Sequence, residues 1–375
     1  MTISQAERSP GFFIPGETED EKKARHNRLF RELRYRVEHA NGKDLLRAHD
    51  SWFFARSVIV HAIIVLTVYL AIQATTVLQW CGIGVLAGFC SVQIGILGHD
   101  LGHYQYLRKS GKKSDLLRLY LGNFCLGFAW SWWVDKHFQH HTTPNQMGKD
   151  PDVEFDWLAF TKEQLAEKGQ GRFTQWQIRN QWWLFWFYLF GQAFNARISS
   201  IKTLKNQTPR REDYNIQMRA IKAHLVLYVL LLVVVGFFVG WTHALAFGLV
   251  HQGTHGYYNS LIFATNHKGM KAYLRSQMPT FLEFQILTSR DVKGYWWFPN
   301  WLLTFLQGGL NHQTAHHLFP LASQQYLGQI QKIVEEFCHE KGIPYRRDSI
   351  FRAYFDVARN FKEVVSDLAD SPMGA

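Results

Sequence analysis

Two long stretches without a formally charged side chain dominate the pattern of the chain. They cover residues 57–99 and 223–267. A helix that crosses the hydrocarbon core of a bilayer needs about 20 apolar residues, so each stretch has room for two spans and a tight turn. We therefore predict two transmembrane helical hairpins. Their four spans are placed at about 55–75, 77–98, 222–241 and 243–265.

Two shorter uncharged stretches, Leu119–Val134 and Asn180–Ala196, are rich in Trp and Phe. At about 1.5 Å per residue each reaches roughly 24–26 Å, less than the hydrocarbon core of about 30 Å. Because Trp favours the membrane interface, we expect interfacial or protein-buried helices here. The predicted fold is all-α integral membrane with a cytoplasmic helical cap. Its predicted parts are a cytoplasmic N-terminal helical segment (1–51), a membrane domain (52–345) and a cytoplasmic C-terminal tail (346–375).

The distribution of charged residues predicts which parts of the chain lie on the cytoplasmic side of the membrane. The chain has 375 residues, 41 Lys and Arg against 30 Asp and Glu, and a mean hydropathy of −0.18 that by itself looks soluble. Residues 104–222 hold 18 basic and 10 acidic side chains, a difference of +8, whereas the expected turns are uncharged. Cytoplasmic segments are enriched in Lys and Arg. We therefore predict a multi-pass membrane protein with both termini and the central loop in the cytoplasm.

Composition also excludes several classes of protein. Four Cys without a recurring spacing exclude a disulfide framework and a Cys-based zinc module. The excess of basic residues is not accompanied by a recognisable nucleic-acid-binding motif, so a nucleic-acid partner is disfavoured. The basic cytoplasmic surface suits an acidic protein instead.

Eight of the 18 histidines fall into three clusters with helical spacing. Side chains three and four residues apart on a helix are neighbours, so each cluster can direct its imidazoles into one volume. Imidazole is a good ligand for iron, zinc, copper and nickel. The clusters are His99 and His103; His137, His140 and His141; and His312, His316 and His317.

The predicted topology brings all three clusters to the cytoplasmic face. His267 ends the second hairpin as His99 ends the first, so it is a further candidate ligand. The metalloprotease signature HExxH is absent, and a zinc site uses only three or four protein ligands. The Glu-x-x-His pattern of soluble di-iron bundles occurs once, at Glu336–His339. An all-histidine site of about nine ligands therefore indicates two irons.

With these motifs the chain resembles the integral-membrane fatty acid desaturases, from about Trp52 to Tyr345. That family has three histidine boxes on the cytoplasmic face of four spans and binds two irons. Further motifs of the resemblance are Trp132-Trp133, Asp150-Pro151-Asp152, residues 266–270, Thr288-Ser289-Arg290 and the run 308–320. The run Gln313-Thr-Ala-His316-His317 is similar to the third box of the front-end desaturases, which insert a double bond between an existing one and the carboxyl end.

The resemblance implies a set of metal ligands. Gln313 takes the place of the first histidine of the third box, and His312 is an alternative ligand because it lies four residues before His316. His251 and His255 match no box and lie deep inside a predicted span, so we expect them to pack or to line an acyl channel. The implied ligands are His99, His103, His137, His140, His141, His267, Gln313, His316 and His317.

Five further residues are expected around the ligands. Carboxylates commonly orient metal-bound imidazoles, and Asp100, Asp150 and Asp152 have suitable positions, with ordinary loop or capping roles as the alternative. Asn145 belongs to the same motif region. Arg290 either binds the substrate headgroup or pairs with one of these aspartates.

The resemblance implies an O2-dependent oxidoreductase that introduces a cis double bond into a fatty acyl-CoA or acyl-lipid in the membrane. The His-Pro-Gly-Gly motif of a fused cytochrome b5 domain is absent. We therefore expect a separate electron donor, cytochrome b5 or ferredoxin with its reductase, which is usually acidic and suits the basic loop. The alternatives are a related membrane di-iron hydroxylase and a metal-binding transporter or scaffold.

Overall fold

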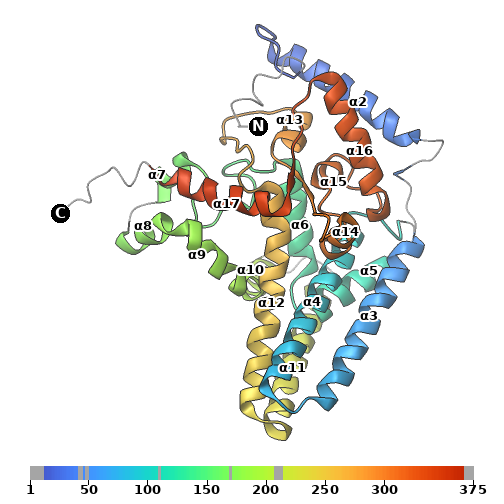
Figure 1. The fold of residues 1–375 in the computed structure, drawn as a ribbon, viewed down its shortest axis with the longest axis vertical. Helices are drawn as coiled ribbons and strands as arrows, with labels where there is room; N and C mark the ends of the chain where they lie inside the picture. Colours follow the sequence, from blue (N-terminus) through green and yellow to red (C-terminus); the bar gives the residue numbers. More distant parts are fainter. Residues whose placement is uncertain are drawn as a thin grey trace. The chain divides into compact units, whose positions relative to one another are not determined.

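The computed structural model describes residues 12–40, 45–46, 50–108, 111–168, 171–206 and 214–366. It is mostly helical (Figure 1) and separates into two compact units. Unit 1 comprises the described residues of 1–47, 136–185 and 262–375, and unit 2 those of 48–135 and 186–261.

Unit 2 contains the long apolar helices. Its first two, α3 and α4, pack along one another and are joined by a short turn. At that turn Thr76 and Gln79 form a capping box in which each side chain accepts a hydrogen bond from the other's backbone N–H, which fixes where α4 begins. The helices of unit 2 are α3 (Asp50–Gln73), α4 (Val77–Gly102), α5 (Lys112–Arg118), the π-helix η2 (Leu119–Cys125), the 3-10 helix η3 (Leu189–Gly191), α10 (Gln192–Asn206) and α11 (Tyr214–Phe238).

Three of the four predicted spans coincide with helices that are long and apolar enough to cross a membrane. Among the described residues these helices are α3, α4 and α11. The fourth prediction, 243–265, falls within α12 (Trp241–His267), whose 27 residues give ample length but include several His, Gln, Asn and Thr side chains. This fourth span therefore stays a prediction.

Two glycines on α4 allow the part of α12 in unit 2 to approach closely. A Cβ atom at Gly88 would lie 2.6 Å from the Thr254 Cβ and 2.9 Å from the His251 carbonyl oxygen, and one at Gly84 would lie 3.0 Å from the Val250 Cβ. Small residues at helix contacts are typical of membrane helix pairs, because close backbones gain dispersion energy that lipid does not supply.

The two shorter uncharged stretches do form helices, but the first is interrupted. It contains η2 and then breaks at Gly127, which has a φ of 74°, before α6 (Trp130–Thr142) begins. The second stretch contains α9 (Gln181–Tyr188), η3 and the start of α10.

The largest apolar core of unit 1 lies among four of its smaller helices, and two smaller apolar clusters lie elsewhere in the unit. Buried side chains of α2, α13, α15 and α16 make up most of this core, for example Leu33, Ile286, Ala315 and Phe337. The chain segment 136–142 of α6 and the end of α12 also belong to unit 1. Its other helices are α2 (Glu19–Glu38), α7 (Lys162–Lys168), α8 (Arg172–Arg179), α13 (Phe281–Leu287), α14 (Asn300–Gln307), α15 (Gln313–Leu318), α16 (Gln324–Lys341) and α17 (Ile350–Val364).

The all-α prediction missed a small parallel sheet in unit 1. Strands β1 (Asp291–Lys293) and β2 (Arg347–Ser349) pair with Val292 opposite Asp348. Three polar-rich residues on each side show no alternation long enough to indicate a strand. The predicted tail 346–375 therefore begins with β2 and α17, and its last residues, 367–375, lie outside the described part of the chain.

Candidate metal centre

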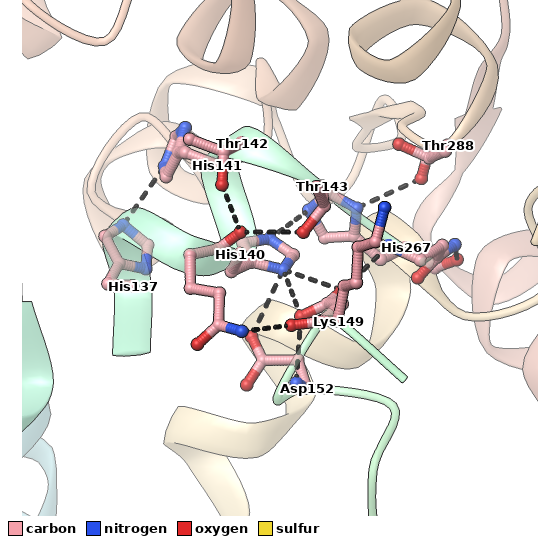
Figure 2. A network of polar contacts seen from close by, with 12 residues as sticks. His137, His140, His141, Thr142, Thr143, Lys149, Asp152, His267 and Thr288 are labelled. Carbon is pink, nitrogen blue, oxygen red and sulfur yellow. Dashed lines mark hydrogen bonds and ion pairs between the residues drawn. The ribbon is translucent and has the colours of Figure 1, made fainter. Parts of the chain in front are cut away.

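The second histidine cluster lies on α6, where helical spacing gathers its imidazoles. Figure 2 shows His137, His140 and His141 along this helix. The Nε2 atoms of His137 and His141 are 3.1 Å apart, as expected for side chains four residues apart.

Two other segments of unit 1 bring histidines to the same place. His267 is the last residue of α12, and His316 and His317 lie on α15. The chain reaches α15 through Gly308 and Gly309, whose φ angles of 63° and 78° are in the left-handed region that glycine adopts without strain. A Cβ atom at Gly309 would lie 2.7 Å from the Gln324 Cγ, so this reversal also requires a glycine for space.

The imidazoles of His140, His267 and His317 form one compact, buried group. One ring nitrogen from each lies within 4.8 Å of the others, and the His140 and His267 Nε2 atoms are 3.3 Å apart. His141 stacks on His317 with ring centroids 4.1 Å apart and meets His316 at 4.8 Å. So many imidazoles buried this close together form a donor set that suits a metal ion.

Each of the three rings has its Nδ1 atom engaged by a different partner. The Nδ1 of His140 lies 3.0 Å from the Asp150 carboxylate. That of His267 lies 3.0 Å from the Thr288 carbonyl oxygen, and that of His317 lies 2.9 Å from Gln285 Oε1. An acceptor at Nδ1 fixes the proton there and leaves the Nε2 lone pair for a metal, the usual arrangement around metal-binding histidines.

Asp150 also orders the loop that follows α6. Besides His140 it accepts hydrogen bonds from the backbone N–H groups of Asn145 at 2.7 Å and Asp152 at 2.9 Å. Burial by itself lowers the pKa of His140, but the Asp150 and Asp152 carboxylates outweigh it and the pKa is raised. Asp152 lies farther from His140, at 3.5 Å, and forms an ion pair with Lys136.

Asn145 ties this loop to the segment after α12. Its backbone has a φ of 54°, a left-handed conformation that Asn tolerates better than most residues. The side-chain Nδ2 donates to the carbonyl oxygens of His267 at 2.9 Å and Lys271 at 3.2 Å. The residue therefore holds the end of α12 in register with the second histidine cluster.

Arg290 is fully buried and forms hydrogen bonds with the chain at the C-terminal end of α12. Its guanidinium contacts Asp348 at 3.3 Å and Asp356 at 3.2 Å and donates to the Lys268 carbonyl oxygen. Its backbone N–H donates to the Asn266 carbonyl oxygen at 3.0 Å. The acidic partners of Arg290 are therefore Asp348 and Asp356, and not Asp100, Asp150 or Asp152 as expected from the sequence. The expected contact with a substrate headgroup stays a prediction.

The first histidine cluster belongs to unit 2, at the end of α4. His99 and His103 have ring centroids 4.6 Å apart, and both are buried. The His99 Nδ1 lies 3.3 Å from the Asp100 carboxylate. Trp133 packs edge-on against both rings, at 5.7 Å and 6.5 Å.

The side chains of Gln313 and His312 contact different groups of residues. The Gln313 Nε2 lies 2.8 Å from the His267 Nε2, and its Oε1 accepts a hydrogen bond from Asn266 Nδ2 at 3.0 Å. The His312 Nε2 instead lies 3.2 Å from Asn311 Nδ2 and 3.4 Å from Thr304 Oγ1. Gln313 is thus the member of this pair that meets the histidine group.

The remaining HxxxH pair, His251 and His255, lies on α12 within unit 2. The His251 ring bridges two hydroxyl groups, with its Nδ1 2.9 Å from the Tyr228 hydroxyl and its Nε2 3.0 Å from Ser91 Oγ. Both histidines are buried. Both ring nitrogens of His251 thus contact hydroxyl groups, and the expectation that the pair packs or lines an acyl channel stays a prediction.

Sequence reasoning missed three residues that orient the third box and the end of α12. Gln285 bridges the second and third boxes, because its Nε2 also donates to the His141 carbonyl oxygen at 3.0 Å. Thr288 acts through a backbone carbonyl, which no side-chain pattern can indicate, although it begins a motif of the resemblance. Asp291 Oδ1 accepts from the Thr314 N–H at 2.8 Å, so it caps the N-terminus of α15 from strand β1.

Replacing Asp291 with Asn is expected to stabilise the protein increasingly as the pH rises from about 4 to 7. Burial raises the pKa of Asp291 to about 6, so the folded state binds this proton more tightly than the unfolded state does. The contribution of the natural carboxyl group to stability therefore falls as the pH rises through this range, whereas an amide retains the bond to Thr314 and does not titrate. Thermal unfolding in detergent at the two ends of the range measures this, and an equal difference at both ends would contradict it.

Comparison with known proteins accounts for this arrangement. Residues 75–349 match the fatty acid desaturase family. The chain belongs to that family. The Delta(5) fatty acid desaturase fat-4 of Caenorhabditis elegans is 26% identical over 353 residues, 92% of this chain and 76% of that protein. The Delta(6)-fatty-acid desaturase fat-3 of the same organism is 27% identical over 340 residues, 87% and 72%. An acyl-lipid (9-3)-desaturase of Physcomitrium patens is 28% identical over 305 residues, 76% and 53%.

Family membership confirms the general character predicted from the sequence. This desaturase is an oxidoreductase with similarity to front-end enzymes. The family uses iron, and the histidine groups described above can hold a metal. A fatty acyl substrate, an electron donor and a membrane location follow in general terms.

Proposed function

We propose that this desaturase introduces a cis double bond between an existing double bond and the carboxyl end of a fatty acyl chain. The observation that carries the proposal is the buried group of His140, His267 and His317, each with its Nδ1 engaged. The Gln-x-x-His-His form of the third box and the Delta(5) and Delta(6) relatives support the front-end position. The substrate is a fatty acyl-CoA or an acyl group of a lipid.

The proposed cofactor is a pair of irons, with O2 as co-substrate. We assign His140, His267 and His317 to the metal because one ring nitrogen of each lies within 4.8 Å of the others, and Gln313 because its side chain contacts His267. The ring contacts of His137, His141 and His316 support their inclusion. His99 and His103 complete the set, as their box predicts.

Bound iron would supply the reduction of O2 and the removal of two hydrogens from neighbouring methylene groups. Two electrons from these C–H bonds and two from the electron donor, with the matching protons, convert O2 into two waters. Asp150, Gln285 and the Thr288 carbonyl accept the Nδ1 protons in hydrogen bonds, so they fix the orientation of the three rings and direct each Nε2 away from these partners. His140, His267 and His317 are at most 3% exposed, which excludes bulk water from their surroundings.

The proposed enzyme is multi-pass, with four spans and with its termini and histidine boxes on the cytoplasmic side. Three apolar helices and the basic segment 104–222 support this orientation. The donor is a separate acidic protein, cytochrome b5 or ferredoxin with its reductase, attracted by the same basic surface.

The decisive experiment expresses the full chain in a host with few unsaturated lipids and supplies fatty acids whose double bonds are known. We expect a new double bond on the carboxyl side of the existing one, located by mass spectrometry of the derivatised products. The same host carrying an inactive His140→Ala chain is the control. A product heavier by one oxygen would identify a hydroxylase, and a new bond on the methyl side would exclude the front-end assignment.

A further inference from the structure

Unit 1 exposes a group of large aromatic side chains that no part of the proposed reaction uses. Trp296 is 93% exposed, Trp297 56% and Trp301 71%, and on α17 Phe351 and Phe355 are 54% and 59% exposed. The Trp297 and Phe351 rings stack with centroids 6.0 Å apart, so the turn after β1 and α17 form one surface. We call Trp296, Trp297, Phe351 and Phe355 the aromatic face.

The turn that carries Trp296 and Trp297 is held in a fixed conformation. The backbone N–H of Tyr295 donates to the Phe298 carbonyl oxygen at 2.8 Å, and that of Phe298 donates back at 3.1 Å. The Gly294 N–H donates to Asn300 Oδ1 at 2.7 Å. A Cβ atom at Gly294 would lie 2.1 Å from the Phe298 oxygen, so only glycine fits. The two tryptophans therefore sit at the tip of a built turn, and their exposure is a property of the fold.

Positive charge accompanies the aromatic face. Lys293, Arg352, Arg359 and Lys362 are exposed beside it or farther along α17. Glu363 is the exposed acidic residue of α17 and pairs with Arg359 at 2.7 Å. Asp356, the other acidic residue of this helix, is buried and pairs with Arg290 and also with Arg352, at 3.1 Å. Arg352 and Arg359 thus have acidic partners on α17, and with Lys293 and Lys362 the aromatic surface carries an excess of basic side chains.

We propose that the aromatic face lies in the headgroup region of the bilayer and binds anionic phospholipid. Tryptophan is enriched at this level of the membrane, and a helix with aromatic and basic residues on its outer side is typical of segments that lie in the interface. The three apolar helices ensure that a bilayer is always close to the chain. A protruding turn suits a deformable lipid surface better than a shaped protein pocket. The face thus gives unit 1 its own membrane contact, in addition to the spans.

The test places a photoreactive benzophenone amino acid at position 296 of the full chain, reconstituted in vesicles of phosphatidylcholine and phosphatidylglycerol. After irradiation and proteolysis, mass spectrometry should find peptide–phospholipid adducts. Two other positions serve as the positive and the negative control for labelling by lipid. Leu230 of the apolar helix α11 is 51% exposed and should be labelled by lipid, whereas Tyr35 of the charged helix α2 is 63% exposed and should not.

We expect lipid adducts at position 296 to exceed those at position 35 several-fold and to favour phosphatidylglycerol. Adducts no more frequent than at position 35, with position 230 labelled, would overturn the proposal. The same experiment in membranes of the expression host also tests the alternative that another protein covers the aromatic face. A conjugate with another protein there, without lipid adducts, would mean that the aromatic face is a protein-docking surface.

Discussion

Replacing His140 with Ala is expected to yield a folded protein that has lost its iron and more than 99% of its turnover. The loss of an outer partner of a metal-bound histidine costs about 10–100-fold, so the loss of the ligand itself should exceed that range. The expectation follows from the position of the ring, whose Nε2 lies 3.3 Å from the His267 Nε2 while its Nδ1 is held by Asp150. Iron per protein, measured by elemental analysis, and product formation are the two readouts.

Two variants make this prediction specific. His39→Ala changes an exposed histidine at the end of α2 and should leave iron content and turnover unchanged. Asp150→Asn should give an intermediate loss of about 10–100-fold, because the amide orients the ring less well than the carboxylate. A His140→Ala protein with the same iron content as the natural chain would remove this residue from the proposed ligand set.

Replacing Arg290 with Met is expected to destabilise the protein by about 3 kcal/mol, near the lower end of the cost of breaking a buried ion pair. The guanidinium is fully buried, and its loss leaves the carboxylates of Asp348 and Asp356 and the Lys268 carbonyl without this donor. Arg346 still pairs with both aspartates, so the upper end of the range is not reached. The midpoint of thermal unfolding in detergent measures the effect.

The matched control is Arg34→Met, which breaks an ion pair of Arg34 with Glu38 on the surface of α2. Exposed pairs contribute at most about 1 kcal/mol, so this variant should unfold close to the natural chain. The pair of variants also separates the ion-pair role of Arg290 with Asp348 and Asp356 from the headgroup-binding role expected from the sequence. An Arg290→Met enzyme of natural stability with a raised KM would show that the residue binds the substrate headgroup.

The histidine group was predictable because its signal is regular. The helical spacing of His137, His140 and His141 predicts that they lie together. The position of His267 at the end of a charge-free stretch indicates that it lies near them. The residues that orient these imidazole rings could be predicted only in part from the sequence. Asp150 stands in a recognisable motif, but Gln285 is a single amide without a pattern, and Thr288 contributes a backbone oxygen that every residue possesses.

The fold was predictable where one physical requirement extends over many residues. The two charge-free stretches contain most of α3, α4 and α11 and all of α12. The polar side chains of α12 lower its hydropathy, so among the described residues only α3, α4 and α11 are apolar enough to be identified as spans. The pairing of β1 with β2 depends on three residues on each side. The partners of Arg290 lie 58 and 66 residues farther along the chain, and no local rule connects them.

The separation of His140, His267 and His317 along the chain has a consequence for how fast the protein is degraded. The first two are 127 residues apart, and their Nε2 atoms meet only in the folded chain. An ion bound to all three would therefore act as a cross-link that closes long loops and adds its binding free energy to folding. A chain made during iron shortage would lack this cross-link and open more often. Desaturase abundance should then follow the iron supply through degradation of the metal-free protein, even at a constant rate of synthesis.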